Sequence, residues 1–112
     1  MPDAARPIGP WRHEVPAIDE AALVAARHAD RLLAEAKERG ITRWVAYLQP
    51  LPDRLRDGDL RDVRLAAMRA RAAYGPKDSV RDALPAELTE PFLESIDRLL
   101  KALARRELRG DS

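Results

Sequence analysis

The clearest pattern of apolar and polar positions lies between residues 60 and 74, where apolar side chains recur at helical spacing on two sides. At about 100° per residue, one broad arc contains Leu60, Val63, Ala66, Ala67, Ala70, Ala73 and Tyr74. A second, narrower arc contains Leu65, Met68 and Ala72. A helix that is apolar on two sides is usually central to a bundle or shared with another chain. We therefore expect the narrower arc to contact a partner.

Both ends of this helix carry residues that cap or stop helices. Asp59 can accept the first free backbone amides as an N-cap, and Asp62 adds a second carboxylate to the positive first turn. Gly75 tolerates the left-handed conformation that ends many helices, and Pro76 cannot continue the hydrogen-bond ladder. These signals predict a helix over residues 59–74.

Other segments also show helical spacing. An alanine-rich face over residues 19–39 and a strongly apolar face over residues 90–108 predict two more long helices. Residues 42–48 and 78–84 predict two short ones, and the connector that contains Pro50 is expected to hold a short turn. The sequence shows no strand pattern and no internal repeat. It predicts an all-α fold, a small helical bundle of three substantial helices plus one or two short helices.

The first 17 residues contain four prolines and predict an extended, proline-rich N-terminal arm. Within it, Trp11 would forgo about 2 kcal/mol of burial if it stayed in water. Two interpretations stay open, because this side chain can pin the arm across its own domain or dock into a partner. The predicted organisation is an arm over residues 1–17, one helical domain over residues 18–108 and a frayed tail over residues 109–112.

Composition narrows the classes of protein to which the chain can belong. Its 112 residues fit one modest core, and the absence of cysteine excludes disulfides and thiolate metal sites. The net charge of +1 gives no strong overall field toward nucleic acid. Neither a signal peptide nor a membrane span is recognisable, so we expect a soluble cytoplasmic protein.

Candidate chemistry is sparse. The chain has two histidines, three serines, no glycine-rich phosphate loop and no nucleophile elbow. His28 lies at the edge of an apolar face, and the residue four positions later is Leu32, so no metal pair forms. We expect no metal and no cofactor, and the sequence favours a non-catalytic protein over an enzyme.

Two arginines form the most distinctive polar feature. Arg64 and Arg71 lie two turns apart between the two apolar arcs of the helix over residues 59–74. A guanidinium flanked by apolar surface needs a carboxylate, carbonyl or phosphate as acceptor. The favoured acceptors are the carboxylates of Glu90, Glu94 or Asp97, in an internal or intersubunit ion pair. The alternative is an anion site for phosphate or nucleic acid, which would be formed by Arg61, Arg64, Arg71, Lys77 and Arg81.

These patterns favour a small accessory or regulatory protein that acts through contacts with another protein or with a second copy of itself. The residues expected at that interface are Trp11, Leu65, Met68 and Ala72. The alternative is a regulator that binds nucleic acid or a phosphate ligand through the arginines listed above. The two classes differ in salt dependence, because phosphate-led binding weakens steeply as salt rises.

Overall fold

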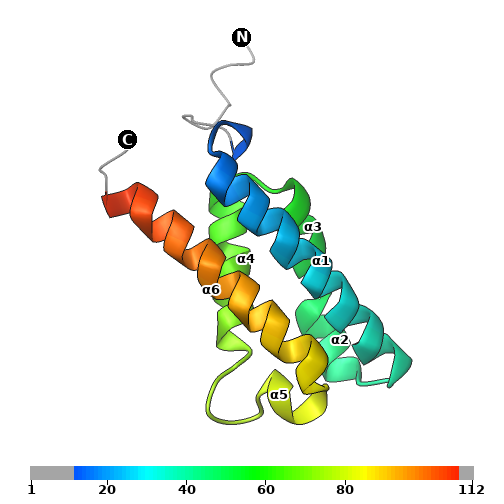
Figure 1. Ribbon diagram of the computed structural model, residues 1–112. Helices are drawn as coiled ribbons and strands as arrows, with labels where there is room; N and C mark the ends of the chain where they lie inside the picture. Colours follow the sequence, from blue (N-terminus) through cyan, green and yellow to red (C-terminus); the bar gives the residue numbers. More distant parts are fainter. Residues whose placement is uncertain (1–11, 109–112) are drawn as a thin grey trace.

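The computed structural model describes residues 12–108, and Figure 1 shows how their helices are arranged. The elements are η2 (Arg12–Glu14), α1 (Pro16–Glu38), α2 (Thr42–Leu48), α3 (Leu51–Asp57), α4 (Leu60–Ala72), α5 (Val80–Ala83) and α6 (Ala86–Leu108). The predicted all-α fold is confirmed. The three longest helices, α1, α4 and α6, match the three substantial helices of the prediction, and the described residues add three short α-helices instead of one or two.

The additional short helix is α3, in the connector that was expected to hold a short turn. Pro52 is the second residue of α3, where its missing N–H is one of the amides that has no intrahelical partner anyway. Leu51, Pro52 and Leu55 are buried, so this face of α3 contributes to the core. From the sequence alone these prolines were interpreted as helix breakers. In the structure they lie at the start of a helix.

The same effect moves the start of α1 and changes the predicted N-terminal arm. Pro16 is the first residue of α1, and η2 precedes it, so residues 12–17 are largely helical instead of extended. Arg12 holds η2 in place before α1. Its Nε donates to Asp19 at 2.8 Å and its Nη1 donates to the Gly58 carbonyl at 2.9 Å. Residues 1–11, with Trp11, and the predicted tail over residues 109–112 lie outside the described residues.

The last helix also begins earlier than predicted, at Ala86 instead of near residue 90. Pro91 therefore lies inside α6, where it has no N–H to offer the carbonyl of Glu87. Two residues before this proline, the carbonyl of Thr89 accepts a hydrogen bond from the hydroxyl of Tyr74. The buried Tyr74 thus joins the segment after α4 to the proline-containing turn of α6.

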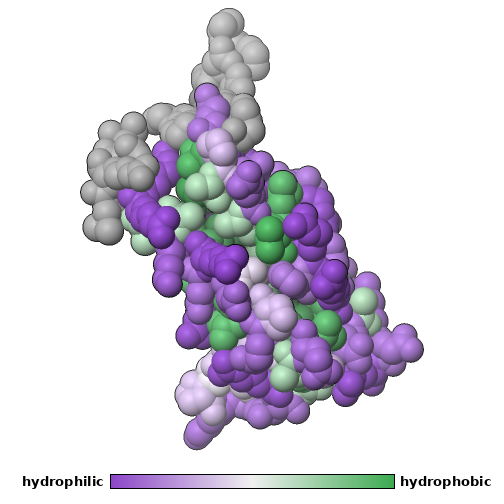
Figure 2. Space-filling model, viewed as in Figure 1, coloured by the Kyte–Doolittle hydropathy of each residue, from purple (hydrophilic) through white to green (hydrophobic). Residues whose placement is uncertain are grey.

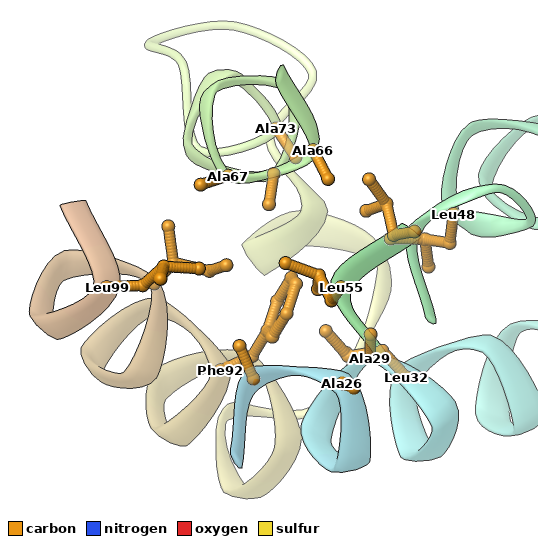
Figure 3. Packing of buried hydrophobic residues seen from close by; sticks show 14 of the residues in the cluster. Ala26, Ala29, Leu32, Leu48, Leu55, Ala66, Ala67, Ala73, Phe92 and Leu99 are labelled. Atoms are coloured by element: carbon orange, nitrogen blue, oxygen red, sulfur yellow. The ribbon is translucent and has the colours of Figure 1, made fainter. Parts of the chain in front are cut away.

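The core lies between α1, α3, α4 and α6. Figure 1 shows α1 and α6 running in opposite directions along the length of the molecule, with α4 behind them. Phe92 of α6 and Leu55 of α3 lie in the middle of the buried cluster, and alanines face them from α1 and α4 (Figure 3). Alanine lets helix axes approach closely, whereas each fully buried Leu or Phe contributes about 1.5–3 kcal/mol. The larger residues of α3 and α6 therefore supply much of the hydrophobic stabilisation, together with Ile18, Leu32, Trp44 and Leu48 of α1 and α2.

Candidate protein interaction surface

The outer face of α4 carries the large apolar side chains that are exposed within residues 12–108. Leu65 is 49% exposed and Met68 is 54% exposed, and Ala72 on the same side is exposed too. We call these three residues the outer stripe. The opposite side of α4 buries Val63, Ala66, Ala67 and Ala70. The structure thus brings three of the predicted interface residues onto one solvent-facing surface, whereas Trp11 lies outside the described residues.

The two arcs of α4 follow from its local sequence. The Asp59 carboxylate accepts from the Asp62 amide at 2.8 Å, which confirms the predicted N-cap. In the helix that begins at this cap, the broad apolar arc of α4 packs against α6 and α3. The other arc points away from both. Because full burial of a Leu or Met side chain is worth about 1.5–3 kcal/mol, the half-exposed side chains of Leu65 and Met68 keep part of that gain for a partner.

One border of the outer stripe is fixed by a contact between α4 and α2. The guanidinium carbon of Arg69 lies 4.1 Å from the ring centre of Tyr47, within the range of a cation–π interaction. Tyr47 in turn packs edge-on against Trp44, with ring centres 5.3 Å apart. Arg69 therefore keeps its positive charge next to the stripe but has restricted freedom. The pairing of Tyr47 with Arg69 could not be predicted from the sequence, because it depends on how α2 meets α4.

The arginines that were predicted to share one anion site are separated in the structure. Arg71 makes an ion pair with Asp97 of α6 at 3.2 Å. Arg81 binds Glu90 through two hydrogen bonds of 3.0 and 2.9 Å, a fork geometry that suits carboxylates. Both acceptors, Asp97 and Glu90, were among the carboxylates predicted for this ridge. Arg71 and Arg81 are thus paired within the chain, as the favoured interpretation expected for Arg71.

The Arg81 pair belongs to a network that closes the end of the bundle. The hydrogen bonds from Arg81 and from the Thr89 hydroxyl lower the pKa of Glu90. Burial and the nearby Glu90 charge raise the pKa of Tyr74, whose hydroxyl remains a donor to the Thr89 carbonyl. Arg81 also lies 5.3 Å from the Tyr74 ring centre. This network explains Arg81 as a structural residue that links α5 to α6.

The remaining arginines of the predicted anion site lie at the other end of α4. Arg61 and Arg64 line a hollow of about 220 Å³ together with Leu60, Leu103 and Arg106. We call it the arginine hollow. Lys77 is exposed beyond Ala72, the last residue of α4, and Ala72 itself lies roughly 16 Å along the helix axis from Arg61 at 1.5 Å per residue. Arg106 could not be predicted at this hollow from the sequence, because only the crossing of α4 and α6 brings it to Arg61 and Arg64.

A second, larger hollow lies between the first turns of α1 and the C-terminal half of α6. It measures about 440 Å³, and Ala17, Ala21, Val24 and Ala102 form its apolar part. Figure 2 shows this apolar surface between the two helices, with hydrophilic side chains around it. The polar lining residues are Glu20, Ser95, Arg98, Lys101 and Arg105. Small side chains on both helices leave this space, because alanines cannot fill the angle at which the helices diverge.

The titratable groups within residues 12–108 do not form a metal-binding cluster. No group of three His, Asp or Glu side chains in this part of the chain could hold a metal ion. Burial, together with the charges of Arg31 and Arg27, lowers the pKa of His28, which lies in the middle of α1. None of the described helices is long and apolar enough to cross a membrane.

Comparison of the chain with models of protein families, with curated proteins and with solved structures finds no match. The function therefore has to be inferred from the surfaces described above, of which the outer stripe of α4 has the most distinctive exposure.

Proposed function

We propose that this chain is a small accessory or regulatory protein that acts by contacting another protein, or a second copy of itself, through the outer stripe of α4. The observation that carries the proposal is the exposure of Leu65 and Met68 on a helix whose opposite face is buried. Single exposed apolar residues are common on proteins. An apolar stripe along one helix is instead the usual anchor of a helix-in-groove or helix-on-helix contact.

The experiment compares three versions of the full chain, gently purified from cells of its source. Native mass spectrometry of the wild-type protein is expected to show a second copy or a companion protein. Met68→Glu places a charge in the stripe and should release that companion while the monomer stays helical. Ala34→Glu adds the same charge to an exposed position of α1 and should retain it. A bare wild-type monomer, or a companion that survives Met68→Glu, would contradict the proposal.

The alternative function is binding of nucleic acid or a phosphate ligand through the arginines around α4. The arginine hollow supports it, because Arg61, Arg64 and Arg106 line one small space. The pairing of Arg71 with Asp97 and of Arg81 with Glu90 weakens it, because those guanidiniums already have carboxylate acceptors. Nucleic acid retained by the wild-type chain and lost from an Arg64→Ala, Arg71→Ala double variant would favour this alternative.

A further inference from the structure

The outer stripe continues to Arg61 and has the spacing of a seam between two helices. Arg61, Leu65, Met68 and Ala72 follow one another at intervals of four, three and four residues, and all four are exposed. At about 100° per residue, these side chains lie within roughly 60° of one another around the axis of α4. Apolar residues at alternating three- and four-residue intervals form the seam along which two helices pack. The stripe therefore fits a second helix.

Charged residues lie on both flanks of this seam. Arg64 and Arg71 are seven residues apart and share one flank, and Asp62 and Arg69 have the same separation and share the other. Arg71 pairs with Asp97, and Arg64 also interacts within its own chain. The first flank is therefore already engaged inside the molecule.

The second flank has one charge of each sign available for a partner. Within the described residues, the Asp62 carboxylate makes no hydrogen bond and no ion pair, and this side chain is exposed. The Nε of Arg69 donates to the carbonyl of Tyr47, and the guanidinium lies over the ring of that tyrosine. Because both of these groups are neutral, Arg69 keeps its positive charge.

Antiparallel packing of two copies of α4 matches the apolar seam to itself. In a two-fold contact, each residue pair across the interface occurs twice. If Leu65 of one copy lies against Met68 of the other, the same register places Arg61 against Ala72 of the other copy. The small side chain of Ala72 leaves room for the apolar stem of Arg61, whose charged end stays in water.

The same register also brings opposite charges together. Asp62 of each copy lies close to Arg69 of the other, because this flank has its carboxylate at the N-terminal end and its guanidinium at the C-terminal end. The flank is thus complementary to its own reverse. A carboxylate and a guanidinium form charge-assisted hydrogen bonds, and the two-fold symmetry produces two such pairs.

A parallel contact would bring like charges together instead. Arg61 would face Arg61 of the second copy, and Arg64 would lie across the seam from Arg69 of the second copy. Like charges placed opposite each other across an interface are unfavourable and suppress that pairing. The charges of α4 therefore favour the antiparallel orientation.

We propose that two copies of this chain associate through their α4 helices in an antiparallel, two-fold contact. This inference rests on the proposed function and specifies a second copy as the partner. Leu65 and Met68 of the two copies interdigitate at the centre, and reciprocal Asp62 and Arg69 pairs lie along one side. The ring of Tyr47 holds the Arg69 guanidinium next to the seam, so this charge is in position before the second copy binds.

The orientation can be tested with thiols, because the chain has no cysteine of its own. The full chain carries Arg61→Cys together with Ala72→Cys and is oxidised in a glutathione buffer. We expect about tenfold more covalent dimer than from either single variant, because in the antiparallel contact equal positions lie roughly 16 Å apart. The double variant Arg27→Cys, Glu38→Cys has the same spacing on an exposed face of α1 and should give no such increase.

Charge reversal tests the predicted pairs with Arg69. Asp62→Arg, in the first turn of α4, turns both pairs into like-charge contacts. In sedimentation equilibrium, we expect this change to weaken the dimer of the otherwise wild-type chain about tenfold. Glu87→Arg makes a matched change in the first turn of α6 and should leave the dissociation constant unchanged. If circular dichroism shows that Asp62→Arg is unfolded, Asp62→Asn takes its place and should weaken the dimer about threefold.

Failure of this inference differs from failure of the proposed function. Covalent dimer from Ala72→Cys alone, at the yield of the double variant, indicates a parallel contact and overturns the inference. A dimer that is equally tight with Asp62→Arg and with Glu87→Arg also overturns it. A monomer that retains a different protein, and loses it with Met68→Glu, overturns the second copy but supports the proposed function. A chain that is monomeric and retains no companion overturns both.

Discussion

Tyr47 and Arg69 each bind the other's backbone. The Tyr47 hydroxyl donates to the Arg69 carbonyl at 2.8 Å, and the Arg69 Nε donates to the Tyr47 carbonyl at 3.1 Å. The carbonyl of Arg69 lies in α4, and the carbonyl of Tyr47 lies near the end of α2. This reciprocal pair therefore holds the short helix α2 against the outer side of α4, next to the outer stripe.

The pair should behave as a coupled unit in unfolding experiments. Tyr47→Phe keeps the ring beneath the guanidinium but loses one hydrogen bond, and we expect it to lower the free energy of unfolding by about 1 kcal/mol. Arg69→Gln removes the reciprocal donor and the cation. In urea unfolding, the double variant should lose less stability than the sum of the two single variants. Additive losses would show that the two contacts act independently.

Gly58 should tolerate alanine much less well than Gly75. A Cβ at Gly58 would lie 2.4 Å from the Arg54 carbonyl oxygen and 2.6 Å from the Asp62 Cβ, so the backbone has to move. We expect Gly58→Ala to cost about 1–3 kcal/mol of unfolding free energy. At Gly75 the nearest contact is the Ala72 carbonyl oxygen at 3.5 Å, an ordinary distance. Thermal unfolding of both variants checks the difference, and similar losses would contradict it.

The same substitution should change stability very differently at two adjacent residues of α4. Leu65 is half exposed, so Leu65→Glu should change the free energy of unfolding by about 0.5 kcal/mol or less. Ala66 is fully buried, so Ala66→Glu forces an unpaired carboxylate into the core and should cost several kcal/mol. Circular dichroism and urea unfolding distinguish the two. A large loss for Leu65→Glu would mean that the outer stripe is buried within the monomer.

His28 should make the fold less stable in mild acid. Partial burial, followed by the charges of Arg31 and Arg27, holds the pKa of His28 below its usual value of about 6.5. The unfolded chain therefore binds this proton more readily than the folded chain. The contribution of His28 to stability is full above about pH 6.5 and falls as the pH decreases toward the folded-state pKa. Urea unfolding of the wild type and of His28→Gln between pH 7.5 and 5 gives the free energy of unfolding as a function of pH. This free energy should fall less steeply with decreasing pH in the variant than in the wild type. Equal slopes would contradict this role of His28.

Protonation of Glu90 should lower the free energy of unfolding in a more acidic pH range than protonation of His28. The hydrogen bonds from Arg81 and Thr89 hold the pKa of Glu90 below its usual value of about 4.3. Its contribution to stability is therefore present above that pH and is lost as the pH falls through the folded-state pKa. Glu90→Gln should remove this part of the acid sensitivity without changing the slope between pH 7.5 and 5. Thr89→Val, which removes only the weaker donor, should have a smaller effect in the same measurement.

The sequence predicted well which side of a helix is buried, but it predicted poorly where the helices cross each other. The two arcs of α4 followed from periodicity, because the side of a helix on which a residue lies depends on that helix alone. Arg106 and Arg61 are far apart in sequence, and only the packing of α6 on α4 brings them to one hollow. The starts of α1, α3 and α6 were wrong for a different reason. Prolines near the starts of α1 and α3 read as breakers, although a helix accepts proline in its first turn. The start of α6 was placed near residue 90 because Pro91 was assigned to a first turn, whereas the helix carries that proline in its interior.

The alanines on the inner face of α4 determine where its outer face lies. Ala66, Ala67 and Ala70 are fully buried and keep the axis of α4 close to its neighbours. A larger side chain at any of them would push the helix outward and displace Leu65 and Met68 with it. The position of the proposed docking surface is therefore set by alanine methyl groups that lie inside the core. The residues of the outer stripe can be exchanged one at a time during evolution. Their position relative to the neighbouring helices can change only through substitutions in the core.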